Sequence, residues 1–324
     1  MKKKLLIAII TIIVIIVAAF TGSYFYTQSM LNKVIRKELP KTDLELGITP
    51  KTNDQPVVTP EKKEDIVNIA FFGVDRRNPD VASRSDSIMV VSINRKDQKV
   101  KVTSLMRDMY VHIPEKEDNR INAAYAIGDA PLAIKTINSN FGTDIRNYVT
   151  VDFFGLQDVI DKVGGVEINV KQNEIEQINK NMREVAAIEG TKIIPVTKAG
   201  AQMLNGMQSV GYSRIRYVGN SDYERTERQR RVLNEVFKKV KAQGAAKLPG
   251  TISTLLPYVE TSLSNDEITL LALDAFKFDT QNIEQFRLPV DGTFNSQKIR
   301  GMAVLVPNIE ENKSKLNEFI YGNR

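Results

Sequence analysis

The hydrophobic and polar positions divide the chain into an apolar N-terminal run, a polar stretch and a long region of alternating patterns. Residues 5–20 are apolar except at Thr11, and they follow three lysines at positions 2–4. With Tyr24-Phe25-Tyr26 behind it, the run reaches the roughly 20 residues that a membrane-spanning helix needs. No clean A-x-A cleavage site follows, which favours an uncleaved anchor over a signal peptide. The pattern therefore predicts a transmembrane anchor at residues 5–26 behind a short N-terminus at residues 1–4.

The stretch from residue 27 to residue 65 is polar and rich in Lys, Glu, Thr and Pro, which predicts an extracytoplasmic stalk or linker. Basic residues at its start offset the N-terminal lysines, so the charge rule alone does not set the orientation. The short basic head and the long domain that follows favour a cytoplasmic N-terminus, because long domains are translocated largely regardless of charge. We therefore expect a single-pass protein of the cell membrane with its main domain, residues 66–324, outside the cytoplasm.

Residues 66–324 show no repeat or low-complexity break and could form one large domain. A near-continuous apolar run, Ile66–Val74, predicts a strand buried on both faces. Helical spacing over Ala123–Phe141 predicts a helix that Gly142 ends. Further strands are predicted at 148–151, 166–170, 193–196 and 303–306, and helical segments at 153–163, 171–188, 198–211, 266–276 and 308–319. The alternation of strands and helices indicates an α/β domain whose helices cover a sheet.

Two β-rich runs, residues 86–94 and 99–106, are separated by four residues, which is typical of an antiparallel hairpin. If Asn94 faces Lys99, counting back along both strands places Asp86 opposite Arg107. By the same alternation, Asp108 points away from Arg107. Asp86 and Arg107 also have a simpler interpretation, an ordinary cross-strand ion pair worth under about 1 kcal/mol.

Acidic and basic residues gather at the end of this hairpin. Asp75 and Arg76 directly follow the apolar strand at residues 66–74, which is predicted to lie beside the hairpin. Carboxylate oxygens hold Mg²⁺, and the guanidinium fork of arginine binds phosphate oxygens in pairs. The grouping of Asp75 and Asp86 with arginines therefore indicates a pyrophosphate site with a metal ion.

A second basic group lies between residues 212 and 231. Arg214 and Arg216 are two positions apart, so in an extended segment their side chains would point to the same side. A helix predicted to start near residue 221 has its apolar stripe at positions 232, 233, 236, 237 and 240. At about 100° per residue, Arg225 and Gln229 fall within the range of this stripe and Arg228 lies just beside it. Unpaired charge that faces inward is costly, which indicates a buried site or cleft that receives an anion.

Composition narrows the chemistry further. The chain has no cysteine and one histidine, His112, which argues against disulfides, zinc sites, thiol catalysis and a histidine-based triad. A formal charge of +6 and a pI near 9.2 indicate an anionic partner, which could be a lipid headgroup, a wall polymer or nucleic acid. A nucleic-acid-binding regulator is disfavoured, because the arginines from 225 to 231 lack a helix-turn-helix pattern.

In their order along the chain, these motifs resemble the LytR-CpsA-Psr family of bacterial envelope proteins. The match comprises G-x-D-x-R at 73–77, R-S-D-S at 84–87, S-x-x-R-D at 104–108, Y-x-R-x-R at 212–216 and D-x-x-R-x-x-R-Q at 222–229. The resemblance implies a three-layer α/β/α sandwich around a mixed central β-sheet, with an apolar tunnel for a polyprenyl tail. It also implies a Mg-dependent phosphotransferase that moves an anionic glycopolymer, a teichoic acid or a capsule-type polysaccharide, from a polyprenyl-pyrophosphate carrier to a hydroxyl of peptidoglycan.

Residue by residue, the resemblance implies Asp75 and Asp86 as Mg²⁺ ligands. The implied pyrophosphate contacts are Arg84, Arg107, Arg214, Arg225 and Arg228, with Arg76, Arg216 and Gln229 as second choices. Asp75 is the candidate base for the acceptor hydroxyl and, with Arg107, makes up the expected catalytic pair. The alternatives are a hydrolase that releases the polyprenyl phosphate to water and a non-catalytic envelope regulator or binding protein. Nothing in the sequence predicts an oligomer, so a monomer is expected.

Overall fold

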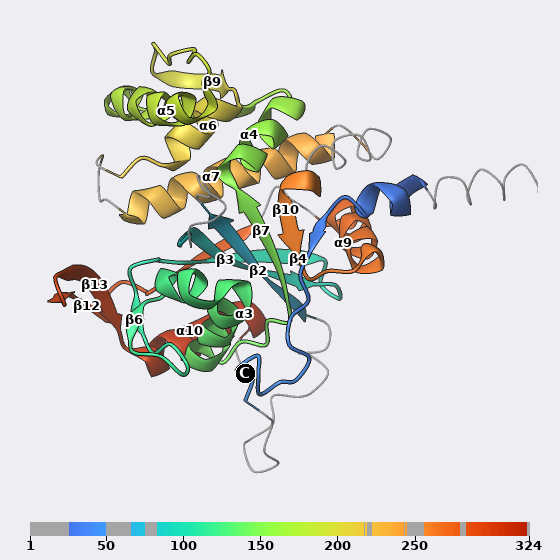
Figure 1. Cartoon of the computed structure of the whole chain (residues 1–324), viewed down its shortest axis with the longest axis vertical. Coiled ribbons are helices and arrows are strands. Elements are labelled where there is room, and N and C mark those ends of the chain that lie inside the picture. The colour runs from blue at the N-terminus through green and yellow to red at the C-terminus, as the bar shows by residue number, and fades with distance from the viewer. Residues whose placement is uncertain are drawn as a thin grey trace, which may run out of the picture.

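The chain folds around β2, the apolar run Ile66–Val74, which lies in the middle of a seven-stranded sheet (Figure 1). The computed structural model describes residues 26–49, 66–74, 83–216, 218, 222–242, 244, 256–278 and 283–322. The strand order is β1-β10-β7-β2-β3-β4-β11. The other strands of this sheet are β1 (Ile35–Arg36), β3 (Ser85–Asn94), β4 (Lys99–Leu105), β7 (Asn147–Asp152), β10 (Val259–Thr261) and β11 (Glu284–Leu288).

The sheet is mixed, as expected, because β2 pairs antiparallel with β3 and parallel with β7. β2 is buried on both sides, with Phe72 in one core and Ile69 in the other. The predicted hairpin is also confirmed, since β3 and β4 pair antiparallel with Asn94 opposite Lys99. This register determines which residues meet at the far end of the two strands.

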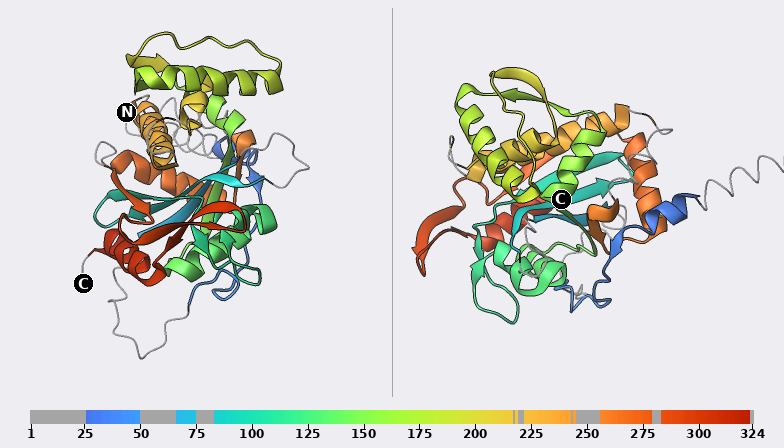
Figure 2. Two further views of the ribbon diagram at one scale, coloured as in Figure 1. Left: turned by 90° about the vertical axis from the view of Figure 1, so that its left-hand side faces the viewer. Right: turned by 45° about the horizontal axis from the view of Figure 1, so that its top comes forward.

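Helices cover both faces of the sheet (Figures 1 and 2). α3 (Asn122–Phe141) and α10 (Ile309–Tyr321) pack into the larger core, and α7 (Asp222–Ala242) and α9 (Asn265–Lys277) cover the opposite face. α3 ends at Gly142 with φ 65°, as predicted. The helix is kinked at Gly128 and Asp129, just before Pro131, because proline lacks the N–H that continues the helical hydrogen bonds.

A smaller group of elements with its own core lies beyond α7, on the side away from the sheet (Figure 2). It pairs two strands, β8 and β9, and surrounds them with short helices. Its elements are α4 (Phe153–Lys162), β8 (Val166–Val170), η1 (Gln172–Glu174), α5 (Ile175–Glu189), β9 (Gly200–Leu204) and α6 (Gly206–Ser213). The apolar stripe of α7 contributes Val232 and Val236 to this core, so α7 separates the two parts of the molecule.

One prediction in this smaller group is wrong, and another is right only in part. Residues 193–196 do not form a strand, because the backbone N–H and C=O of Val196 bond to the side chain of Asn179 instead of a neighbouring strand. Residues 198–211, predicted as a short helical region interrupted by Gly200 and Gly206, are helical only from Gly206 onward. They begin with β9, and a capping box between Asn205 and Gln208 then starts α6.

The same capping box also overturns the extended segment predicted at Arg214 and Arg216. Helix α6 continues through Ser213, and Arg214 is its C-cap with φ −93° and ψ −2°. Tyr212 and Ile215 are fully buried in the smaller core, which anchors this end of the helix. Arg214 and Arg216 therefore do not lie together in an extended segment.

The remaining elements lie mainly toward the C-terminus. The predicted helices at 266–276 and 308–319 and the predicted strand at 303–306 are confirmed as α9, α10 and β13 (Met302–Pro307). β11 and β12 (Phe294–Ile299) were not predicted, because polar residues interrupt the apolar pattern in the first and exposed polar residues dominate the second. Short elements complete the described fold: β5 (Tyr110–Val111), β6 (Asn119–Arg120) and η2 (Leu256–Tyr258).

Part of the stretch predicted as a stalk, residues 27–65, packs on the folded domain. Residues 26–31 are helical, and β1 pairs parallel with β10 at the edge of the sheet. Met30, Leu31 and Val34 are buried against Leu256. These apolar positions are few and lie among many charged residues. The composition of the stretch therefore did not indicate a packed segment. Residues 50–65 lie outside the described residues.

The predicted anchor at residues 5–26 lies almost entirely outside the described residues, since only Tyr26 is included. Within the described ranges, no helix has the length and apolar character needed to cross a membrane. The anchor therefore stays a prediction.

If the N-terminal segment is part of the domain, Leu31→Ala will lower the free energy of unfolding by about 2–5 kcal/mol, because it removes a buried leucine from a packed cluster. Leu31 is 3% exposed, whereas Leu44 in the same stretch is 78% exposed. Leu44→Ala is therefore the matched control and should leave stability unchanged. Urea unfolding followed by circular dichroism measures both, and equal midpoints would show that residues 27–49 do not stabilise the domain.

Candidate active site

Asp86 lies between two arginines from distant parts of the chain. Arg107 Nη1 donates to Asp86 Oδ1 at 2.5 Å, and Arg216 Nη2 lies 3.5 Å from Asp86 Oδ2. These partners are 21 and 130 residues away in sequence. The side chains of Asp86 and Arg107 are 20% and 14% exposed, and that of Arg216 is 40% exposed. The cluster thus extends from the largely buried Arg107 to the partly exposed Arg216.

The sheet register brings Asp86 and Arg107 together. Met89 faces Ser104 at the end of the paired region, and three more residues along each chain lead to Asp86 and Arg107. On the other side, Val74 at the end of β2 pairs with Ser85. Gly73 allows this close approach, since a Cβ there would lie 2.9 Å from the Cβ of Ser87. The predicted contact between Asp86 and Arg107 is therefore confirmed.

A second carboxylate holds Arg107 from its other side. Asp108 Oδ2 lies 3.5 Å from Arg107 Nε, and Asp108 Oδ1 accepts from Arg120 Nη1 at 2.9 Å. The expectation that Asp108 points away from Arg107 is wrong, because β4 ends at Leu105 and residues 107 and 108 lie in a turn. Arg120 comes from β6, a two-residue strand that the sequence pattern did not reveal.

The structure gives Arg214 a different neighbour from Arg216. Arg214 Nη2 lies 3.9 Å from Glu184 Oε2 of α5, and the arginine side chain is largely buried. Because the chain is helical up to residue 213, two positions do not carry the side chains to the same side. Arg216 therefore reaches Asp86, whereas Arg214 lies toward the smaller core.

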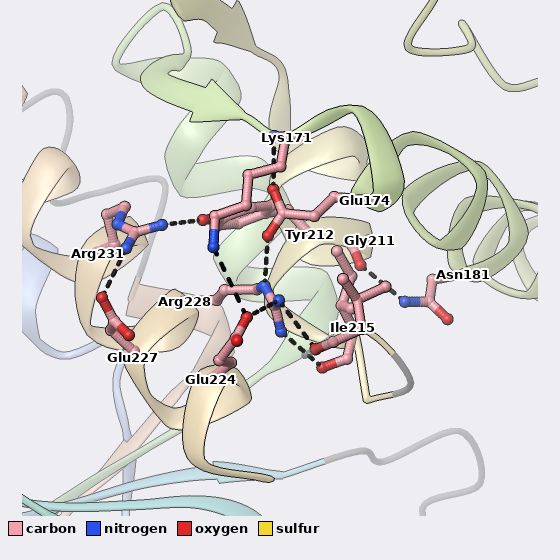
Figure 3. Close-up of polar contacts among 11 residues, drawn as sticks. Lys171, Glu174, Asn181, Gly211, Tyr212, Ile215, Glu224, Glu227, Arg228 and Arg231 are labelled. Atoms are coloured by element: carbon pink, nitrogen blue, oxygen red, sulfur yellow. Dashed lines mark hydrogen bonds and ion pairs between the residues drawn. The ribbon is translucent and has the colours of Figure 1, made fainter. Parts of the chain in front are cut away.

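One inward charge of α7, that of Arg228, has an acceptor within the protein. Arg228 Nε donates to Glu174 Oε1 at 2.8 Å, and both side chains are only 1% exposed (Figure 3). Arg228 Nη2 donates to Glu224 Oε2 at 2.6 Å. The anion predicted to receive this arginine is thus Glu174, which the sequence analysis did not single out.

The other predicted site residues occupy varied environments. Arg225 is buried on α7, as the helical phase predicts, and Gln229 is partly buried. Arg84 is exposed immediately before β3. Asp75 and Arg76 follow the end of β2 and lie outside the described residues. Among the residues that the structure places, no group of three or more His, Cys, Asp or Glu side chains could by itself hold a metal ion.

The arrangement can bind an anion. Guanidinium groups donate several hydrogen bonds in a fixed fork, and those of Arg107 and Arg216 are already oriented by a carboxylate. Because Arg216 is partly exposed, it can reach a phosphate group in solvent while Arg107 stays fixed by Asp86 and Asp108. A phosphate-containing ligand is the type of molecule that this site suits best.

Comparison with known proteins agrees with the motifs and the fold. The regulatory protein MsrR of Staphylococcus aureus (strain COL) is 29% identical over 266 residues, which covers 81% of this chain and 76% of MsrR. The polyisoprenyl-teichoic acid–peptidoglycan teichoic acid transferase TagU of Bacillus mycoides (strain KBAB4) is 31% identical over 233 residues, 71% of each chain.

The fold is shared with solved structures as well. YwtF (TagT), a LytR-CPS2A-psr family protein with bound octaprenyl pyrophosphate lipid, aligns with a TM-score of 0.62 at 23% identity, over 89% of this chain and all of that chain. The model of the LytR_cpsA_psr family matches residues 28–318, which include every described element of the central sheet. The chain therefore belongs to the LytR_cpsA_psr family.

Proposed function

We propose that this protein is a phosphotransferase that moves a glycopolymer from a polyprenyl-pyrophosphate carrier to a hydroxyl of peptidoglycan. The observation that carries the proposal is Asp86 held between Arg107 and Arg216, one fixed and one partly exposed. The relative TagU is named for the transfer of teichoic acid to peptidoglycan, and the TagT structure contains a polyprenyl pyrophosphate. Both names support the same chemical class of substrate.

The proposed reaction replaces the phosphoanhydride bond of the pyrophosphate with a phosphodiester bond to the acceptor. The acceptor hydroxyl oxygen attacks the phosphorus that carries the glycopolymer, and the bond from that phosphorus to the bridging oxygen breaks. Polyprenyl phosphate leaves, and the hydroxyl proton passes to a base, for which we propose Asp75. Such transition states spread negative charge over the phosphate oxygens, so the protein mainly positions the groups and offsets charge. Arg107 and Arg216 supply this positive charge beside Asp86.

We also propose Mg²⁺ as the cofactor. Mg²⁺ keeps several waters and is usually bound by one or two carboxylates together with substrate phosphates, so a closed cage of protein ligands is not required. The partly exposed carboxylate of Asp86 fits one such ligand, and Asp75 at the end of β2 is the proposed second. When bound, the ion would offset charge on the phosphate oxygens.

The apolar face between α7 and the sheet is the proposed place for the polyprenyl tail. Leu233, Phe237, Val102 and Ile283 line a small cavity of about 10 Å³ there, together with polar side chains from α7 and β11. Ligand sites commonly measure about 300–1,000 Å³, so a polyprenyl chain would need more room than this interface provides. The tail would therefore have to displace α7 from β4 and β11 as it enters.

We propose that residues 5–26 anchor the protein in the cell membrane, with the N-terminus in the cytoplasm and the domain outside. Because residues 26–31 already pack on the domain, the anchor would lead into the fold without a long flexible stalk. The active site would then stay close to the bilayer that holds the lipid carrier. The protein is proposed to act as a monomer, with peptidoglycan as its acceptor.

We expect Arg107→Lys and Asp86→Asn in the full-length protein to lower transfer by about 10²- to 10³-fold, because each removes a fixed group at the charge-bearing centre. Lysine keeps the charge of Arg107 but cannot contact Asp86 and Asp108 together through one fork. The assay follows label from a polyprenyl-pyrophosphate glycan into peptidoglycan fragments, with release of polyprenyl phosphate measured in parallel.

Matched controls lie at the other end of the same hairpin. Arg95→Lys and Asp97→Asn make the same chemical changes in and beside the exposed turn and should leave transfer unchanged. Release of polyprenyl phosphate without label transfer would indicate a hydrolase. Full transfer by the Arg107 and Asp86 variants would rule out this site.

Removal of divalent ions by a chelator should abolish transfer, and added Mg²⁺ should restore it. If Asp86 is a ligand, Asp86→Asn will raise the Mg²⁺ concentration for half-maximal transfer on the order of tenfold or more. Arg107→Lys should lower the maximal rate with a smaller change in that concentration. Transfer that persists in the chelator would contradict a role for the metal ion.

A further inference from the structure

A single guanidinium group holds the backbone on both sides of Arg216. Arg228 Nη1 donates to the carbonyl oxygen of Ile215 at 3.5 Å, and Arg228 Nη2 donates to the carbonyl oxygen of Val218 at 3.3 Å (Figure 3). Ile215 is itself fully buried. The segment that carries Arg216 to Asp86 is therefore attached to α7 through Arg228.

Arg228 is in turn fixed from behind by acidic groups. Glu174 Oε1 accepts from Arg228 Nε, and Glu174 Oε2 accepts from the backbone N–H of Lys171 at 2.8 Å. Glu224, one turn before Arg228 on α7, accepts from Nη2. Every nitrogen of the guanidinium thus donates to a protein oxygen. The side chain is 1% exposed, which leaves no surface for a phosphate group.

The C-terminal end of α6, which precedes Arg216, is held by side chains from α5 and α7. Asn181 Nδ2 donates to the carbonyl oxygen of Gly211 at 2.8 Å, and Arg231 Nη1 donates to the hydroxyl of Tyr212 at 2.5 Å (Figure 3). Burial raises the pKa of Tyr212, so its phenol stays neutral and accepts this bond. The position of Arg216 is therefore set by contacts before and after it.

We infer that Arg228 and Glu174 are positioning residues, which hold Arg216 against Asp86 instead of contacting the substrate. The inference rests on the proposed phosphotransferase function, because it assigns Arg216 to the phosphate group. It differs from the expectation drawn from the family resemblance, which made Arg228 itself a phosphate contact. Lysine cannot replace Arg228 here, since a single ammonium cannot reach two carbonyl oxygens and a buried carboxylate in one plane.

The first test is independent of turnover. Amide hydrogen exchange, measured by mass spectrometry on full-length protein, should become faster in peptides that contain residues 214–218 when Arg228 is changed to Lys. Glu235→Gln is the matched control, because Glu235 pairs with Lys238 further along the same helix. That variant should exchange like the wild type. Unchanged exchange at 214–218 in Arg228→Lys would overturn the inference.

The second test separates positioning from direct contact. Arg228→Lys should lower transfer on the order of 10- to 100-fold through misplacement of Arg216, and it should cause no further loss when combined with Arg216→Ala. Losses that multiply in the double variant would show direct contact with substrate. Arg228→Lys could exchange faster at residues 214–218 and still transfer at the wild-type rate, at temperatures where it is folded. That result would show that Arg228 has a role in stability alone.

A milder variant keeps the test open if Arg228→Lys does not fold. Glu174→Gln removes one buried charge but keeps an amide oxygen for Arg228, and it should show the same pattern with smaller changes. Absence of transfer by the wild type would defeat the proposed function. The exchange measurement would still report whether Arg228 holds the Arg216 segment.

Discussion

The contact of Asp86 with two guanidinium groups depends on two separate parts of the fold. Arg107 is placed by the register of β3 and β4, which the four-residue turn sets at the opposite end of the hairpin. Arg216 is placed by the smaller core beyond α7. Asp86 and Arg107 are largely buried, and the loss of solvation on burying such a pair offsets much of its attraction. The value of this cluster therefore lies in its geometry, since it orients donors before a ligand arrives.

Arg216 and Arg228 differ in burial, and this difference decides whether each could contact a ligand. Arg216 is 40% exposed and contacts one carboxylate oxygen at 3.5 Å, so it can turn toward a ligand at little cost. Arg228 is 1% exposed, and a ligand could reach it only by breaking a buried ion pair. Removal of one partner from such a pair leaves a charge without compensation. The Y-x-R-x-R and D-x-x-R-x-x-R-Q motifs therefore contribute arginines that suit different roles, although both motifs look like sets of anion-binding residues.

The sequence predicted those features whose signal is local. The apolar run of β2, the turn of the hairpin and the glycine at the end of α3 each predict their own structure, and the hairpin register then predicted that Asp86 and Arg107 meet. Glu174 could not be found in this way, because it lies 54 residues before Arg228, just ahead of α5, and no local spacing relates it to α7. The prediction of an extended segment at Arg214 and Arg216 was wrong for a related reason. A spacing of two fits a strand only if the chain is extended, and the capping box of Asn205 and Gln208 had already started a helix.

The N-terminal segment would set how the domain lies relative to a membrane, if residues 5–26 are the proposed anchor. Three buried side chains, Met30, Leu31 and Val34, fix residues 26–36 at the edge of the sheet beside β10. A flexible stalk over residues 27–65 would instead let the domain range over a distance of roughly 5–6 Å times the square root of the stalk length. A carrier lipid keeps its pyrophosphate at the bilayer surface, and a domain without slack must present its arginines at that height. If the anchor lies in the membrane as proposed, the packing of β1 on β10 therefore helps to set which face of the sheet the lipid can approach.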